Sequence, residues 1–190
     1  MPVTQPTSFT LEQVKIEQAI YQWLDSVVIG LNLCPFAKKP RAQNQIRLSI
    51  ATSADTNTLL DLFIEEMTLL ANTPAVETDT TLFAIPTGLE QFDDYLGFLD
   101  VCQMTLENFG YEGKFQLASF HPNYQFDGTE VNDRENYTNR SPVPIIHLIR
   151  EDSMSRVLKQ YPDSEAIPER NIEVVESLTE QQMKTLFKGR

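Results

Sequence analysis

Apolar residues recur along much of the chain every three or four positions, the period of an amphipathic helix. Thr10 followed by Gln13 has the pattern of a capping box at the start of the first such segment. Gly30 and Gly110 stand where the first and third segments end, as glycines at helix C-termini commonly do. The pattern predicts three helices, at about residues 11–29, 55–73 and 92–109.

Four shorter segments have the composition or the two-residue alternation of β-strands. They lie at residues 46–51, 80–86, 114–120 and 144–150. The first three strands alternate with the predicted helices, and this order favours parallel crossovers. We therefore expect an α/β (or α+β) fold, with a mixed sheet of about four strands and helices packed on it.

The remaining C-terminal part is predicted to be helical, interrupted at Pro162 and Pro168. Its last helix is expected at residues 178–187, with Ser177 as the cap and Glu180 as the capping-box partner. At 190 residues the chain has the length of a single compact domain, residues 1–190. Residues 1–9 lack either pattern and are expected to form a flexible N-terminal arm.

The chain carries a formal net charge of −12 and has a pI near 4.5. Binding to nucleic-acid phosphates or to an anionic membrane surface requires concentrated basic charge, so neither partner is expected. No apolar run reaches the roughly 18 residues of a membrane helix. The first residues do not resemble a secretion signal and there are only two cysteines, so a cytoplasmic protein with reduced thiols is predicted. The oligomeric state is left open.

The segment 121–144 is long for a loop in a compact domain, and such loops are often functional. It contains Tyr124, Phe126 and Tyr137 among polar residues, which favours an ordered loop folded over the sheet. If the strands on either side of it pair in antiparallel fashion, the two histidines, His121 and His147, lie near the same end of the sheet. Each is a candidate catalytic base, and each has the alternative of a buried structural imidazole.

Arg140 stands in a run of short polar residues that could help it hold an anionic ligand. Asn136, Asn139 and Tyr124 are candidate binding residues beside it. The alternative is that this polar run organises the loop by bonding to its own backbone.

Cys34 follows the first helix in the sequence GLNLCPFAKKPR and precedes Pro35, a residue favoured at the first position of a helix. A thiol at such an N-terminus is close to backbone N–H groups and to Lys38, both of which favour the thiolate. Three interpretations remain open: a packed thiol, a reactive thiol and a metal ligand. Lys38 and Arg41, just downstream, are candidates for binding an anion.

Three segments, VVIGLNLCPFA (27–37), FHPNYQF (120–126) and NYTNRSPVPIIHLIRED (136–152), resemble the family called domain of unknown function 1415. They occur in the family's order, and the resemblance covers nearly the whole chain. Where the family pattern has an aromatic residue, this sequence has Val143. The resemblance implies one intact domain and supplies no mechanism.

These features support three hypotheses of function. The first is an enzyme or binding protein for a small anionic molecule, with Cys34, His121 and His147 as catalytic groups and no cofactor. The second is a divalent-metal site formed by the same three residues. The third is a non-enzymatic interaction protein that binds its partner through the aromatic residues of the long loop.

Overall fold

The computed structural model describes residues 10–159 and 164–187. The predicted N-terminal arm and Pro162 lie outside the described residues. The helices are α1 (Leu11–Trp23), α2 (Lys38–Ala42), α3 (Thr56–Asn72), α4 (Phe92–Asn108), α5 (Glu151–Leu158), α6 (Ile167–Glu176) and α7 (Glu180–Leu186), with a π-helix η1 (Leu24–Ile29) and 3₁₀ turns η2 (Arg134–Thr138) and η3 (Ser164–Ala166). The strands are β1 (Ile46–Ile50), β2 (Thr80–Ala84), β3 (Phe115–Phe120) and β4 (Ile145–Arg150).

The four strands form one mixed sheet in the order β1-β2-β4-β3. β1 and β2 are parallel and joined by α3, while β4 is antiparallel to both of its neighbours. The predicted α/β class and the mixed sheet of four strands with helices packed on it are confirmed. The middle strands are β2, which lies between β1 and β4, and β4, which lies between β2 and β3. Each is therefore hydrogen-bonded to a neighbour on both edges.

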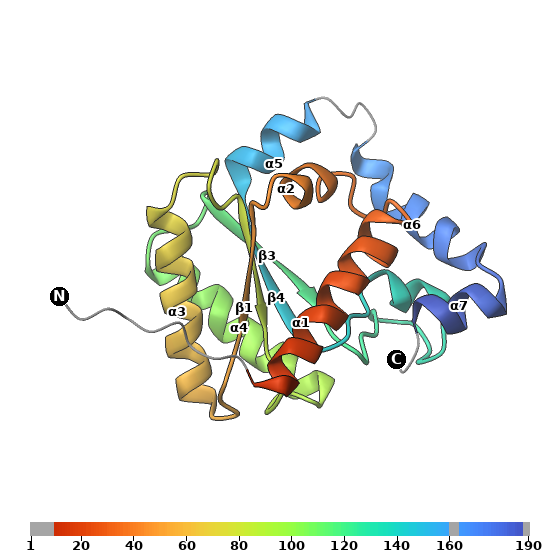
Figure 1. Ribbon diagram of the computed structural model, residues 1–190, viewed down its shortest axis with the longest axis horizontal. Helices are drawn as coiled ribbons and strands as arrows, with labels where there is room; N and C mark the ends of the chain where they lie inside the picture. The colour runs from red at the N-terminus through yellow and green to blue at the C-terminus, as the bar shows by residue number, and fades with distance from the viewer. Residues whose placement is uncertain (1–9, 160–163, 188–190) are drawn as a thin grey trace.

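Helices cover both faces of the sheet, as Figure 1 shows, with α3 and α4 on one side and α1, α6 and α7 on the other. Two separate cores result. The α3–α4 core includes Phe63, Phe83, Tyr95, Ile146 and Leu148, and the α1 core includes Ile20, Trp23, Leu82, Ala84 and Ile145. Successive residues of β2 and β4 alternate between the two cores, as side chains of a strand must.

The first helical segment ends at Ile29 as predicted, but the reason differs from the expected one. Thr10 and Gln13 form the predicted capping box. Gly30 is not left-handed, since its φ is −63°. A Cβ there would collide with the backbone carbonyl of Ser26, so the glycine allows a close approach. The left-handed residue that turns the chain is Asn32, with φ of 55°.

The cap of the last helix also differs from the prediction. Thr179, not Ser177, accepts a hydrogen bond from the backbone N–H of Gln182, and the Gln182 side chain completes the capping box. Pro168 does not break a helix but occupies the first turn of α6, where a missing N–H costs nothing.

Arg150, the last residue of β4, fastens the C-terminal end of α3 to the sheet. Its guanidinium donates to the backbone carbonyls of Leu70 at 2.5 Å, Thr73 at 2.5 Å and Thr78 at 3.1 Å. A cation at this position also complements the negative end of the helix dipole.

Replacing Arg150 by methionine should lower the free energy of unfolding by about 2–4 kcal/mol, because partly buried carbonyls lose a charged donor. Denaturant unfolding measures this change. Arg156→Met, which removes an exposed arginine of α5, is the control and should change stability by no more than about 0.5 kcal/mol. Equal losses in the two variants would contradict the role given to Arg150.

Candidate functional site

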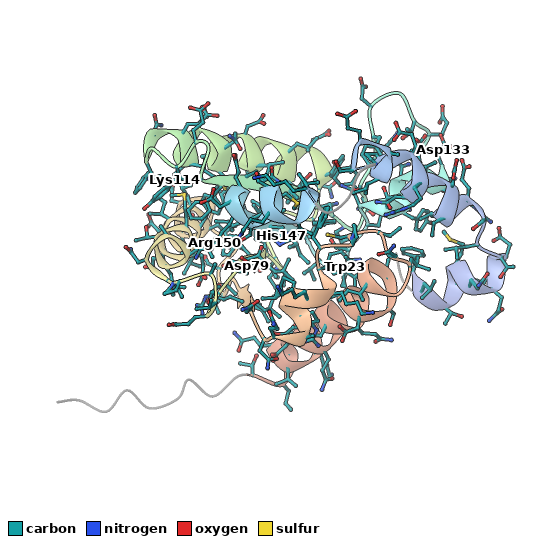
Figure 2. All side chains as sticks on the ribbon, turned by 90° about the horizontal axis from the view of Figure 1, so that it is seen from above. Trp23, Asp79, Lys114, Asp133, His147 and Arg150 are labelled. Atoms are coloured by element: carbon teal, nitrogen blue, oxygen red, sulfur yellow. The ribbon has the colours of Figure 1, made fainter. Side chains whose placement is uncertain are left out.

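A cavity of about 790 Å³ lies on the α1 side of the sheet, and we call it the His147 cavity. Three walls enclose it: the strands, the segment from Trp23 through the Cys34 turn to α2, and α5. In the view of Figure 2, His147 lies between Asp79, which directly precedes β2, and Trp23, the last residue of α1. Its apolar lining includes Trp23, Leu24, Val28, Phe36, Ile46, Leu82, Phe120, Ile149, Met154 and Val157, and its polar lining includes Cys34, Lys39, Gln43, Gln45, Asp79, Thr80, His147, Ser153 and Arg156.

His147 is held from β2. Its Nε2 lies 2.6 Å from the Thr80 hydroxyl oxygen, and that hydroxyl lies 2.5 Å from the backbone carbonyl of Leu148. The Phe120 ring packs beside the imidazole, with centroids 6.4 Å apart. Burial lowers the pKa of His147 from 6.5 to about 4, because a charged imidazole is poorly solvated there. The ring is therefore neutral at pH 7.

The Cys34 turn follows the π-helix and is held in place by α6. The backbone N–H groups of Leu33 and Cys34 both donate to the Val28 carbonyl, at 2.9 and 3.3 Å. From α6, Arg170 donates to the Asn32 carbonyl at 3.0 Å and Asn171 donates to the Leu33 carbonyl at 2.7 Å. These contacts place the thiol in the wall of the cavity that also contains His147.

Of the three interpretations of Cys34, the structure favours the packed thiol over the reactive one. The backbone N–H groups of Phe36 and Ala37 do interact with the sulfur and favour the thiolate, as the sequence suggested. Burial outweighs them and raises the pKa of Cys34, because the thiolate loses more hydration than two N–H groups restore. Burial raises the pKa of Cys102 as well, and this thiol lies in the α3–α4 core.

Charged groups are placed where α5 and α2 line the cavity. Asp79 accepts a hydrogen bond from Ser153 at 2.5 Å, and Ser153 in turn accepts one from Arg156 at 2.9 Å. Lys39 lines the cavity from α2. Among the described residues, neither Lys39 nor Arg156 is in an ion pair with a carboxylate. Neither positive charge is therefore neutralised by a carboxylate of the described residues.

His121 lies on the other side of the sheet and is fully buried. Its Nε2 lies 3.0 Å from the Leu89 carbonyl, and its Nδ1 accepts a hydrogen bond from the backbone N–H of Asn123 at 3.0 Å. The ring packs against Phe92 and Tyr95. Burial lowers the pKa of His121. Both ring nitrogens are engaged, so the structure favours the structural alternative for this histidine.

The polar run of the long loop bonds to the loop itself. Arg140 donates to the carbonyls of Val131 at 2.6 Å and Tyr124 at 3.3 Å and lies over the Tyr137 ring. Asn136 is fully buried, accepts from the Phe126 N–H at 2.9 Å and donates to the Glu130 carbonyl at 2.8 Å.

The other predicted loop residues also have partners within the fold. Asn139 donates to the Ser119 carbonyl at 3.1 Å, and the Tyr124 hydroxyl lies 3.3 Å from the Ser119 hydroxyl. None of residues 121–144 lines the His147 cavity. The rings of Tyr124, Phe126 and Tyr137 are half-buried rather than gathered in an exposed patch.

The two basic residues predicted beside Cys34 do not line its cavity either. Arg41 forms a forked pair with Asp25, at 2.8 and 3.0 Å, and lies over the Tyr21 ring. Lys38 is absent from the cavity lining, whereas its neighbour Lys39 is part of it. Of the nine predicted site residues, the cavity therefore brings together Cys34 and His147.

The ligand set predicted for a metal is not assembled. Ala118, the partner of His147 in β3, is three residues from His121, and an odd separation along a strand places side chains on opposite faces. No group of three or more His, Cys, Asp or Glu side chains that could hold a metal ion occurs in the part of the chain that the structure describes.

Sequence reasoning missed the other polar residues of the cavity: Lys39, Gln43, Gln45, Asp79, Thr80, Arg150, Ser153 and Arg156. Thr80 begins a strand and is indistinguishable by sequence from a β-branched residue chosen for packing. Asp79, directly before that strand, carried a usable signal, because polar residues at strand ends often contribute to sites. The residues of α5 carried none, since their position depends on how that helix packs.

The fold and the site define an α/β domain with a cavity of small-molecule size against one face of its central strands. The chain belongs to the family described as "Protein of unknown function (DUF1415)", whose model matches residues 15–185. The resemblance found in the sequence is thereby confirmed. Comparisons with curated proteins and with solved structures gave no match. Within the described residues, no helix is both long enough and apolar enough to cross a bilayer.

The lowered pKa of His147 should make stability depend on pH. The unfolded chain takes up a proton at the ordinary histidine pKa of 6.5, whereas the folded protein does so only near pH 4. Between these values the unfolded state binds more protons, so the free energy of unfolding falls as the pH falls. The loss attributable to His147 should reach about 3 kcal/mol at pH 4.

His147→Gln is the reference for this measurement, because its amide can still donate to Thr80 but does not titrate. The carboxylates and His121 contribute equally to the pH dependence of the unmodified protein and of His147→Gln. The difference between their unfolding free energies therefore isolates the contribution of His147. A difference that stays constant from pH 7 to pH 4 would show that the imidazole is not desolvated.

The raised pKa of Cys34 should make the folded protein react slowly with iodoacetamide at pH 7. Its labelling rate should rise with pH through a midpoint above that of a free cysteine, about 8.5. Mass spectrometry of the Cys34 and Cys102 peptides gives both rates separately, and Cys102 should stay unlabelled until the protein unfolds. Fast labelling of Cys34 with a midpoint near pH 7 would restore the thiolate hypothesis.

Proposed function

We propose that this protein binds a small anionic molecule with an apolar body in the His147 cavity. The observation that carries the proposal is the cavity itself, which combines a mostly apolar lining with three cations, Lys39, Arg150 and Arg156. Arg150 already donates to backbone carbonyls, which leaves Lys39 and Arg156, on separate walls, for a ligand. Its volume of about 790 Å³ suits a molecule the size of a metabolite or cofactor.

The apolar body of the ligand would lie against Trp23 and Phe120. Their rings pack edge to face, with centroids 5.2 Å apart. Trp23 and Leu82 are each 2% exposed, so the half-buried Phe120 supplies most of the exposed apolar surface among these three residues. Covering apolar surface with a ligand is favourable by about 25 cal/mol per Å² removed from water, so the apolar lining contributes to binding in proportion to the area that is still exposed.

The charge of the ligand is inferred from the contrast between the cavity and the whole chain. The net charge of −12 repels anions in general, so local cations must compensate wherever an anion is to bind. Arg156 also lines a second hollow of about 430 Å³, together with Lys159, the residue after that helix. The anionic group is therefore placed toward α5, with Lys39 contributing from α2.

Binding of 8-anilinonaphthalene-1-sulfonate tests the proposal, because this probe joins an aromatic body to a sulfonate. Trp23 is the only tryptophan of the chain and lines the cavity, so the bound probe should quench its emission by energy transfer. The double variant Lys39→Met with Arg156→Met should bind the probe about 5- to 30-fold more weakly at low salt, if each charge contributes about 0.5–1 kcal/mol.

Two controls separate the effect of the cavity cations from non-specific hydrophobic binding. N-phenyl-1-naphthylamine has the same rings without the sulfonate, and its affinity should be unchanged by the double substitution. Lys114→Met removes an exposed lysine that lies over the Tyr111 ring, at a distance from His147 in Figure 2, and should not weaken sulfonate binding. The proposal would be refuted if the bound probe did not quench Trp23 emission. It would also be refuted if Lys114→Met weakened sulfonate binding as much as the double variant does.

A further inference from the structure

The hydrogen bonds around Thr80 determine which tautomer His147 adopts. The Thr80 hydroxyl has one hydrogen and lies within bonding distance of two atoms, the Leu148 carbonyl oxygen at 2.5 Å and His147 Nε2 at 2.6 Å. A carbonyl oxygen can only accept, so the hydroxyl hydrogen is directed to Leu148. The Thr80 oxygen must then accept a hydrogen bond from Nε2, which therefore carries the imidazole proton.

The other ring nitrogen, Nδ1, consequently holds a lone pair. It forms no hydrogen bond within the described residues, unlike Nδ1 of His121. Among those residues, the only fully buried side-chain nitrogen or oxygen without a partner is the Thr81 hydroxyl. Nδ1 of His147 is thus accessible, and because the residue lines the cavity, this atom is available to whatever the cavity contains.

We infer that Thr80 holds His147 as a hydrogen-bond acceptor for the ligand, so that the cavity takes an anion bearing an O–H or N–H group on its apolar body. This inference rests on the proposed function for the existence of a ligand and deepens it by naming a second recognition group. Thr80 is a positioning residue, since it acts through His147.

The site around this acceptor suits that role. The imidazole is neutral at pH 7, so the lone pair is present under ordinary conditions. Thr80 is buried, which shields its two hydrogen bonds from competing water. The cations Lys39 and Arg156 lie on α2 and α5, whereas His147 lies on β4, so the ligand's anionic group and its donor would contact different walls. The other charged groups of the cavity, Asp79 directly before β2 and Arg150 at the end of β4, already have hydrogen-bond partners.

The tautomer can be measured without any ligand. In ¹⁵N-labelled protein, long-range ¹H–¹⁵N spectra distinguish a protonated ring nitrogen from one with a lone pair, and His147→Gln identifies the signals of His147. We expect a proton on Nε2 and a non-bonded lone pair on Nδ1. Thr80→Ser should preserve this pattern, whereas Thr80→Val, which keeps the shape but removes the hydroxyl, should give a mixture of tautomers. A proton on Nδ1 in the unmodified protein would overturn the inference.

Recognition of the donor is tested with 2-naphthoate and 6-hydroxy-2-naphthoate, two anions that differ by one hydroxyl. Calorimetry should show that the hydroxyl improves affinity by about 3- to 10-fold, the value of one net hydrogen bond. The gain should disappear in His147→Phe and shrink in Thr80→Val but not in Thr80→Ser. Equal binding of both naphthoates overturns the inference and leaves the proposed function intact. Failure of both to bind, together with no binding of the sulfonate probe, instead refutes the proposed function.

Discussion

The burial of β2 and β4 on both faces is the constraint on which the rest of the structure depends. Because each strand must fill two cores, its side chains alternate between the α3–α4 face and the α1 face. Ile146 and Leu148 fill the first core, so His147 between them must face the second. His147 is half-buried there, and the cavity beside it is the space that the segment from Trp23 to α2 and the helix α5 leave open against the strands.

Much of the fold could be predicted from the sequence, since the periodicity of apolar residues records which face of each element is buried. The capping box at Thr10 and the end of the first helical segment at Ile29 are local features, and both were predicted correctly. The cap of α7 was misplaced by two residues, because Ser177 with Glu180 and Thr179 with Gln182 both fit a capping-box pattern. Which of two overlapping patterns is used depends on where the preceding helix ends, and that is not a local property.

The two histidines show where sequence reasoning fails for the site. β3 and β4 do pair in antiparallel fashion, which meets the condition for the two histidines to lie near the same end of the sheet. Whether they share a face depends on whether the pairing register is odd or even. A shift of one residue would have placed both rings on the same side of the sheet. The observed register pairs His147 with Ala118 and sends His121 toward Phe92 and Tyr95 of α4. Register is fixed by the packing of whole faces, which no short motif records.

Cys34 and Thr80 illustrate opposite errors with the same physical origin. At Cys34 the sequence showed the backbone N–H groups that favour a thiolate, but not the burial that opposes them, and burial is the larger effect. At Thr80 the sequence showed only a β-branched residue suited to a strand. Its hydroxyl is buried beside the Leu148 carbonyl oxygen and donates its one hydrogen to that oxygen. The hydroxyl oxygen can then only accept from His147, so the imidazole Nε2 must be the donor. Burial thus disfavours the thiolate form of Cys34, whereas at Thr80 it fixes which nitrogen of the His147 imidazole carries the proton.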